Sequence, residues 1–359
     1  LPERFMFLSY NILAADNARE HYRELYYHIP MRYVKWDWRK VRLVQEIEYW
    51  SPDILCLQEV DRFADLQGEL VKRGYAGTFK RRTGTATDGC AIFWREKRFL
   101  LLEEESIDFK DYGLRDNIGQ ICVLRSTREA ALEGDVSSIE NQVLVVANTH
   151  ILFNPKRGDI KLGQARFDFA QELSSSWGGA QVIVAGDFNS TPSSPLYRYI
   201  STAELDVSSL DRRSISGQIA DGEGGYYRNP FSKPWIRGHN PSSAGFSRIN
   251  LPSGWTVEEL VNATGTSSST KVVHDLKLSS AYSEIEGKAG SRDSQGEPLA
   301  TTYHKKFKGT VDYIWHTERL RPLRVVDMLS VDVLRHTGGL PSQKWGSDHL
   351  ALVCEMEFS

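Results

Sequence analysis

Short apolar runs recur along this chain, and their arrangement limits the folds that the chain can adopt. Some of these strand-like runs follow one another directly, whereas others alternate with stretches of helical spacing. A purely parallel barrel would require strict alternation, so the mixture favours two packed sheets with helices on their outer faces. A chain of 359 residues, 40% of them apolar, can bury such a core as one large α/β domain or as two small ones.

The spacing of the apolar residues predicts the individual elements. A helix is expected after Asp37, a candidate cap, with Val41 and Val44 on its buried face. Helical spacing is also present at residues 66–71 and 160–173. The predicted strands are residues 5–10, 54–57, 89–94, 121–124, 143–147, 182–185, 311–315, 325–328 and 350–356.

Residues 208–299 differ from the rest of the chain, because they are rich in Ser and Gly and contain few periodic apolar segments. Such a composition buries too little apolar surface to offset the entropy of ordering the chain. We therefore predict one domain over residues 1–359 that carries 208–299 as a flexible surface insertion. We prefer this to a separate small domain, because the segment has no core of its own.

Charge and cysteine usage exclude several classes of protein. With 44 Lys and Arg against 47 Asp and Glu, the chain is not a basic protein that binds polyanions through its overall charge. Cys56, Cys90, Cys122 and Cys354 are isolated, which argues against a zinc knuckle or a disulfide framework and predicts reduced thiols in a cytosolic or nuclear protein. No membrane-spanning run or signal peptide is present, so no membrane partner is expected, although a chain that begins with Leu1 leaves an upstream targeting segment open.

Polar motifs stand at the ends and edges of the predicted strands. A single polar residue there usually caps a turn or faces water. Several in one α/β protein gather at a single rim, where ligands bind, so we expect a functional site. These motifs contribute Asn11, Glu59, Asn148, His150, Asp187, Asn189, Asp312, Asp348 and His349.

These residue types suit the hydrolysis of a phosphoester. Mg²⁺, or Mn²⁺ in its place, prefers oxygen ligands, which Glu59 with Asp348 or Asp187 could supply to one or two ions. An aspartate can orient an attacking water, and an aspartate such as Asp312 beside His349 would keep the imidazole protonated. The donors available to the phosphoryl oxygens are His349, His150, Asn11 and Asn189.

The ordered set of motifs resembles the carbon catabolite repressor 4-like deadenylases, nocturnin and the Angel proteins of the endonuclease/exonuclease/phosphatase superfamily. The resemblance covers roughly residues 5–200 and 310–358 and is nearest to the Angel proteins at 148–162 and 187–192. The motifs that carry it are Ser-Tyr-Asn, Leu-Gln-Glu-Val, Asp-Gly-Cys-Ala, Asn-Thr-His, Gly-Asp-Phe-Asn-Ser, Val-Asp-Tyr-Ile and Ser-Asp-His.

The resemblance implies a four-layer α/β/β/α sandwich with the site between the two sheets. On the metal side, it implies that Glu59 is the main ligand and that Asn11 and Asp348 complete the set.

On the substrate side, the resemblance implies that Asp187 activates or orients the water and that Asn189 contacts the phosphate. It also implies that His349 lies on the scissile phosphate with Asp312 behind it, and that His150 lies on the other flank.

Basic residues adjoin several of these motifs and predict a local positive rim for a polyanion. Solvated loop charges are the alternative interpretation of any single cluster. The candidate substrate contacts are Arg82, Asn148, Lys156 and Arg157. The three basic clusters are 80–82, 156–157 with Lys161, and 305–306 with Lys308.

Phe307 bears on the choice of substrate. It matches the position of a base-stacking Phe in the deadenylases, although plain packing is the alternative. We therefore predict a magnesium-dependent 3′ exoribonuclease that acts on poly(A) at the 3′ ends of mRNA. The alternatives are an Angel-like 2′,3′-cyclic phosphatase of RNA ends, a nocturnin-like dinucleotide phosphatase, and an inactive scaffold, which the complete set of acidic and His residues argues against. The sequence contains no leucine-rich repeats by which the protein could join an RNA-decay complex.

Overall fold

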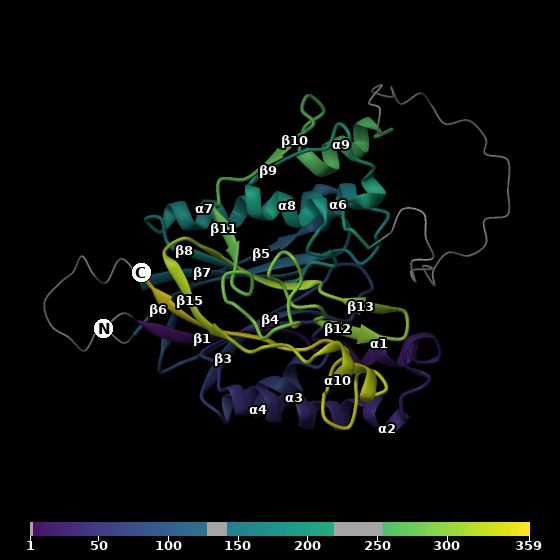
Figure 1. The fold of residues 1–359 in the computed structure, drawn as a ribbon. Helices are drawn as coiled ribbons and strands as arrows, with labels where there is room; N and C mark the ends of the chain where they lie inside the picture. The colour runs from purple at the N-terminus through teal and green to yellow at the C-terminus, as the bar shows by residue number, and fades with distance from the viewer. Residues whose placement is uncertain (1–2, 128–141, 219–253) are drawn as a thin grey trace, which may run out of the picture.

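The computed structural model describes residues 3–127, 142–218 and 254–359 (Figure 1). Within these residues, two six-stranded mixed sheets pack face to face, and helices cover their outer faces. The predicted α/β fold class, a four-layer α/β/β/α sandwich, is confirmed. None of the described helices combines the length and the apolar character needed to cross a bilayer.

The first sheet is covered by two helices, α3 (Trp36–Trp50) and α4 (Phe63–Val71). Only the pair β1–β2 is parallel, and the other neighbouring strands are antiparallel. The strand order is β15 (Leu320–Val325), β16 (Leu352–Phe358), β1 (Arg4–Asn11), β2 (Ile54–Gln58), β4 (Gly89–Arg95) and β3 (Tyr75–Arg81).

The second sheet also contains one parallel pair, β7–β8. The strand order is β11 (Leu278–Ser280), β14 (Asp312–Thr317), β8 (Gln181–Asp187), β7 (Val143–His150), β6 (Ile118–Ser126) and β5 (Phe99–Asp108). The helices on its outer side are α6 (Gly158–Gln164), α7 (Asp168–Ser176), α8 (Pro195–Thr202) and α9 (Val257–Thr264).

Alternation along the strands decides which side chains fill the space between the sheets. Phe5 and Phe7 of β1 and Ile183 of β8 point into this middle core, whereas Leu8 of β1 packs against the helices. All four cysteines are buried and unpaired, as the sequence predicts.

Shorter elements extend the sandwich at its edges. They are α1 (Ala15–Glu20), the π-helix η1 (Tyr22–Tyr26), α2 (Met31–Val34), the 3-10 turns η2 (Phe109–Tyr112) and η5 (Arg212–Ser214), β9 (Glu204–Asp206) with β10 (Lys271–Val273), the hairpin β12 (Thr302–His304) and β13 (Phe307–Gly309), and α10 (Val331–His336).

Three local predictions need correction. The strand expected at 325–328 instead ends at Val325, where β15 stops. The helix expected at 160–173 is divided into α6 and α7, because Phe167 adopts a left-handed backbone with φ of 61°. Val41 is 49% exposed, so the buried face of α3 is formed by other residues, including Leu43.

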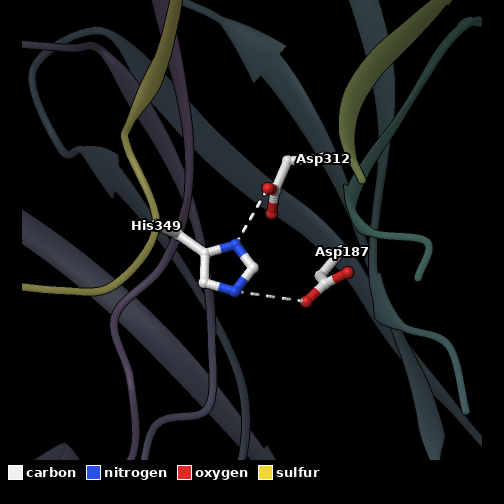
Figure 2. Close-up of side chains that lie close together, drawn as sticks. All are labelled: Asp187, Asp312 and His349. Carbon is white, nitrogen blue, oxygen red and sulfur yellow. Dashed lines mark hydrogen bonds and ion pairs between the residues drawn. The ribbon is translucent and has the colours of Figure 1, made fainter. Parts of the chain in front are cut away.

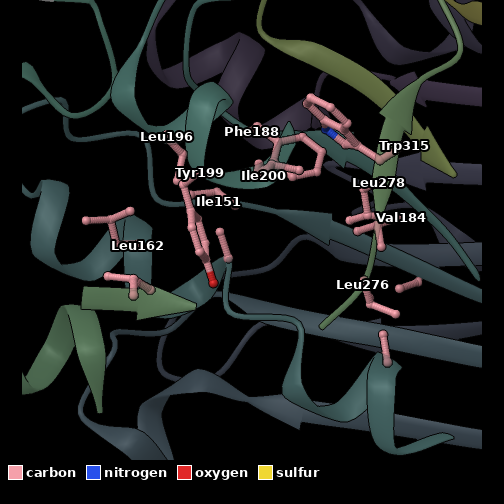
Figure 3. Close-up of a cluster of buried hydrophobic side chains, with 14 of the residues drawn as sticks. Ile151, Leu162, Val184, Phe188, Leu196, Tyr199, Ile200, Leu276, Leu278 and Trp315 are labelled. Carbon is pink, nitrogen blue, oxygen red and sulfur yellow. The ribbon is translucent and has the colours of Figure 1, made fainter. Parts of the chain in front are cut away.

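The described parts of the predicted flexible insertion contribute to the core, so that prediction is wrong for residues 254–299. Trp255 is only 1% exposed and belongs to the core beneath the second sheet. Leu276 and Leu278 belong to the same core, as Figure 3 shows. A capping box formed by Thr256 and Glu259 begins α9. The composition concealed this because a few large buried residues, spaced irregularly, supply the packing. Residues 219–253 of the predicted insertion lie outside the described residues.

Candidate active site

Strand register brings the predicted polar residues to one rim of the sandwich. His150 and Asp187 are partners at the shared end of parallel strands β7 and β8, and Asp312 pairs with Asp187 from β14. In the first sheet, Asn11 pairs with Gln58, the residue before Glu59. All these side chains lie on the inner faces of the sheets, so a cavity of about 250 Å³ between the sheets receives groups from both.

His349 and Asp312 form a buried hydrogen-bonded pair at the centre of the site (Figure 2). The distance from His349 Nδ1 to Asp312 Oδ2 is 2.9 Å, and Nε2 faces Asp187 Oδ2 at 3.8 Å. Burial alone would lower the pKa of His349, but the carboxylates of Asp312, Asp348 and Asp187 raise it well above its ordinary value. The raised pKa favours the protonated imidazole, which donates from Nδ1 to Asp312 and directs Nε2 toward Asp187.

Glu59 also lines the cavity, and its carboxylate is held as an anion. Its carboxylate accepts hydrogen bonds from the backbone N–H of Ala14 at 3.0 Å and from the side-chain amides of Asn17 and Asn11 at 2.9 and 3.1 Å. Burial favours the neutral acid, but the nearby His150 and these donors lower the pKa of Glu59 to about 2. A buried carboxylate held ionised suits a divalent cation with oxygen ligands.

The other two predicted metal ligands have protein partners. Asn11 donates its amide to Asp187 Oδ2 at 3.0 Å as well as to Glu59, so it links two carboxylates. Asp348 Oδ2 accepts a 2.7 Å hydrogen bond from the hydroxyl of Tyr26. Ligand atoms of Asp187, Asp312 and His349 also lie within 4.8 Å of one another, but Nδ1 of His349 is already engaged by Asp312 at 2.9 Å. Glu59 is therefore the better centre for a cation.

Asn189 and His150 form the remaining wall. Asn189 has a left-handed backbone with φ of 46°, and its N–H donates to Asp187 Oδ1 at 2.9 Å. Its amide nitrogen lies 3.1 Å from His150 Nε2 and 3.0 Å from the carbonyl oxygen of Ile151. This turn fixes the carboxylate of Asp187 relative to both side chains.

Comparison with known proteins agrees with this geometry. Residues 8–349 match the sequence profile of the endonuclease/exonuclease/phosphatase family. The chain belongs to this family. Its members share the reaction type that the site suits, the hydrolysis of phosphoester bonds.

Relatives of this family member include carbon catabolite repressor protein 4 homolog 5 of Arabidopsis thaliana, which is 49% identical, with 100% of this chain and 78% of the relative covered. Protein angel homolog 1 of Homo sapiens is 31% identical, and the match covers 98% of this chain and 62% of that relative. A similar solved structure is the crystal structure of ANGEL2, described as a 2′,3′-cyclic phosphatase, in complex with adenosine-2′,3′-vanadate. Its TM-score is 0.78 at 30% identity, and the match covers 99% of this chain and 96% of that chain. The human nocturnin catalytic domain, at 23% identity and a TM-score of 0.58, supports the fold alone.

Two predicted substrate contacts line the cavity of this family member. Phe307 does so from the hairpin β12–β13. Arg82 also lines it, but its guanidinium is held 2.5 Å from the buried carboxylate of Asp88.

The other three predicted contacts do not line the cavity. Asn148 is fully buried and joins the two sheets, because its amide donates to the carbonyl oxygens of Leu57 and Ala91, each at 3.0 Å. Lys156 and Arg157 lie outside, and Arg157 pairs with Asp159 at 2.7 Å.

The predicted basic rim is partly neutralised, which weakens the charge argument. Lys80 pairs with Asp108 at 2.9 Å, and Lys306 lies 3.6 Å from Glu24. Lys161, expected on the rim, is fully buried. Adjacent basic residues in the sequence did not predict this, because their partners come from distant segments.

Lys161 has an internal role that its sequence context did not indicate. Its ammonium group donates to the carbonyl oxygen of Asn189 at 2.7 Å. This contact stabilises the turn that follows Asp187. Burial lowers the pKa of Lys161 to about 7, although the charge of Asp187 opposes this shift.

Arg39 is a second buried cation that sequence reasoning missed. One of its guanidinium nitrogens lies 2.8 Å from each of the carbonyl oxygens of Ile12 and Leu13 and 3.2 Å from that of Gly346. These carbonyls belong to the loops that carry Asn11 and Asp348. Arg39 therefore holds these two loops together.

His304 also lines the cavity and was not predicted. Its Nδ1 accepts a hydrogen bond from the backbone N–H of Lys306 at 3.3 Å, which leaves Nε2 as the donor. Burial, with the charges of His349 and Lys306, lowers the pKa of His304 to about 4, so the ring is neutral at pH 7. Its ring lies 6.3 Å from that of Phe307.

Proposed function

We propose that this protein is a magnesium-dependent 3′ exoribonuclease that removes nucleotides from the poly(A) 3′ end of RNA. The observation that carries the proposal is the position of Phe307 in the same cavity as Glu59 and His349. An aromatic ring beside the hydrolytic groups provides a surface on which the 3′ base can stack. A site that reads a terminal phosphate alone does not need such a ring.

The metal side of the proposed reaction rests on Glu59. With Asp348, and with Asn11 aligning the carboxylates, it would hold one Mg²⁺, and Mn²⁺ could replace it. When bound, the ion would neutralise charge on the phosphoryl oxygens and orient the substrate.

The protein's own groups would complete the reaction. Asp187, aligned by the N–H of Asn189 and the amide of Asn11, would accept a hydrogen bond from the attacking water and orient it toward phosphorus. The protonated His349, held by Asp312, would donate to a phosphoryl oxygen as negative charge develops there. Asn189 and His150 would bind the same phosphate from the other flank.

A second candidate function is the hydrolysis of a 2′,3′-cyclic phosphate at RNA ends. The similarity to ANGEL2, described as a 2′,3′-cyclic phosphatase, favours it. The two activities require the same metal and the same donors, and they differ in what the cavity recognises. The deadenylase recognises a terminal base, whereas the phosphatase recognises a terminal phosphate.

Product analysis separates the two candidates. RNAs labelled at the 5′ end and ending in oligo(A), in another base or in a cyclic phosphate are incubated with the protein and magnesium, and the products are measured by mass spectrometry. The proposal predicts progressive shortening of oligo(A) with release of mononucleotides. Loss of the cyclic phosphate without shortening of any RNA would contradict the deadenylase and support the phosphatase.

A further inference from the structure

A second cavity, of about 510 Å³, is lined by residues of α2, of α10 and of the segments beside them. The loop at residues 337–345 after α10 forms one of its walls. The backbone N–H of Leu340 in this loop donates to the carbonyl oxygen of Tyr303 in β12 at 3.2 Å. The next residue of β12, His304, lines the active site. A backbone hydrogen bond therefore joins the loop that lines the second cavity to the strand that lines the active site.

The lining of the second cavity suits a nucleotide. It contains the half-buried rings of Tyr33 and Trp345, the imidazoles of His28 and His336, and the ammonium group of Lys344. Among the residues that the structure describes, this lining includes no aspartate or glutamate, although the whole chain has 47 acidic and 44 basic residues. Bases stack on aromatic side chains, and phosphates favour a cationic wall without carboxylates.

A short segment connects the two cavities. Tyr26 contacts Asp348 in the active site, and His28, two residues later, lines the second cavity. Between them, the Tyr27 ring is 53% exposed and Lys305 Nζ lies 6.0 Å from its centre. An exposed ring beside a lysine can bind a base and a phosphate together. Burial and the charge of Lys305 lower the pKa of His28, so this ring is neutral at pH 7 and can also stack.

We propose that the second cavity binds upstream nucleotides of an RNA whose 3′ end occupies the active site. Tyr27 and Lys305 would carry the chain from one cavity to the other. The inference rests on the proposed function and extends it, because it makes the preferred substrate an oligonucleotide several residues long. Figure 1 shows the elements involved, α2, α10 and the hairpin β12–β13, at the same end of the sandwich.

The first test compares two substrate lengths. We expect kcat/KM for a six-nucleotide oligo(A) to exceed that for a two-nucleotide oligo(A) by about five- to 150-fold, the value of one stacked base. Tyr33→Ala and Lys344→Gln should each reduce this ratio several-fold. Tyr112→Ala and Lys110→Gln are the matched controls. They alter an exposed ring and an exposed lysine of η2, which follows β5 of the second sheet. Their ratios should equal that of the unaltered protein.

The second test measures binding without catalysis. The Kd of a 5′-labelled hexanucleotide is determined by fluorescence anisotropy in EDTA at several salt concentrations. Tyr33→Ala should weaken binding by the same factor as in the kinetic test. Lys344→Gln should reduce the slope of log Kd against log salt by about 0.7, the value of one lost phosphate contact on a single strand. A purely structural effect of Lys344→Gln would leave the slope unchanged.

The two tests have separate consequences. The inference would be overturned by equal kcat/KM for the two lengths. It would also be overturned if the Tyr33 and Lys344 variants left the length ratio and the salt slope unchanged. In either case, shortening of oligo(A) would still support the exoribonuclease. Hexanucleotide binding that depends on Tyr33 and Lys344, without any shortening of RNA, would overturn the exoribonuclease and support the second cavity as an RNA site. Absence of both binding and shortening would overturn both.

Discussion

At the scale of single residues, Glu59 is the side chain on which the metal assignment depends. Glu59→Gln removes the charge that the Ala14 N–H and two amides stabilise, with little change in volume. We expect turnover to fall by about 100-fold or more at saturating magnesium. The exposed Glu104 offers a matched control, since Glu104→Gln should leave turnover unchanged. Near-normal turnover of Glu59→Gln would show that the metal is held elsewhere.

The buried pair of His349 and Asp312 predicts a pH effect. Because Asp312 raises the pKa of His349, the donating imidazolium persists below this raised pKa and is lost as the pH rises through it. In Asp312→Asn the pKa of His349 should fall, so the alkaline limb of the pH–rate profile should move to lower pH. Asp332→Asn, at an exposed position, should leave the profile unchanged. An alkaline limb that stays in place in Asp312→Asn would exclude this pairing as the source of the limb.

Phe307 should separate base recognition from chemistry. If its ring stacks the 3′ base, Phe307→Ala should weaken oligo(A) degradation by about five- to 150-fold. Hydrolysis of a small generic phosphodiester should not change, because the ring does not belong to the hydrolytic groups. The two rates are measured side by side on the same preparation. A loss of both rates in proportion would indicate that Phe307 only packs the hairpin.

Sequence could predict individual site residues where a motif places them at the end of a strand, as for Asp187 and His150. It could not predict groups whose function depends on partners from distant segments. Arg39 lies in the first turn of α3 and has no motif around it. Asn148 belongs to a recognised motif, yet its position on the inner face, two residues before His150, makes it a link between the sheets. Only the three-dimensional contacts separate these cases.

At the scale of elements, apolar runs predicted most of the central strands, because buried strands carry a dense local signal. The segment after residue 253 was missed, because its packing rests on isolated large residues such as Trp255. Trp255→Ala should lower the free energy of unfolding by about 3–5 kcal/mol. Urea unfolding followed by circular dichroism would measure this. Tyr49→Ala, at a ring that is 77% exposed, is the control, and a loss as small as that control's would contradict a core role for Trp255.

At the scale of the whole molecule, the two sheets contribute different halves of the site, with Glu59 on one and Asp187 on the other. A cation that neutralises carboxylates from both sheets should stabilise the folded state. At a magnesium concentration 100 times its Kd, we expect the free energy of unfolding to rise by about 2.7 kcal/mol relative to EDTA. Urea titrations with and without magnesium would detect this change. Glu59→Gln should show no such difference, and an equal gain in that variant would mean that the ion stabilises another site.

The amide of Asn148 fastens β7 to two strands of the opposite sheet, directly beneath the catalytic rim. The alignment of the site therefore depends on the contacts between the two sheets. If the layers slide apart by the length of a hydrogen bond, each retains its strands and most of its helices. Glu59 of one layer and Asp187 of the other nevertheless lose their alignment. Chemistry should therefore fail under mild denaturing stress while the secondary structure is still intact.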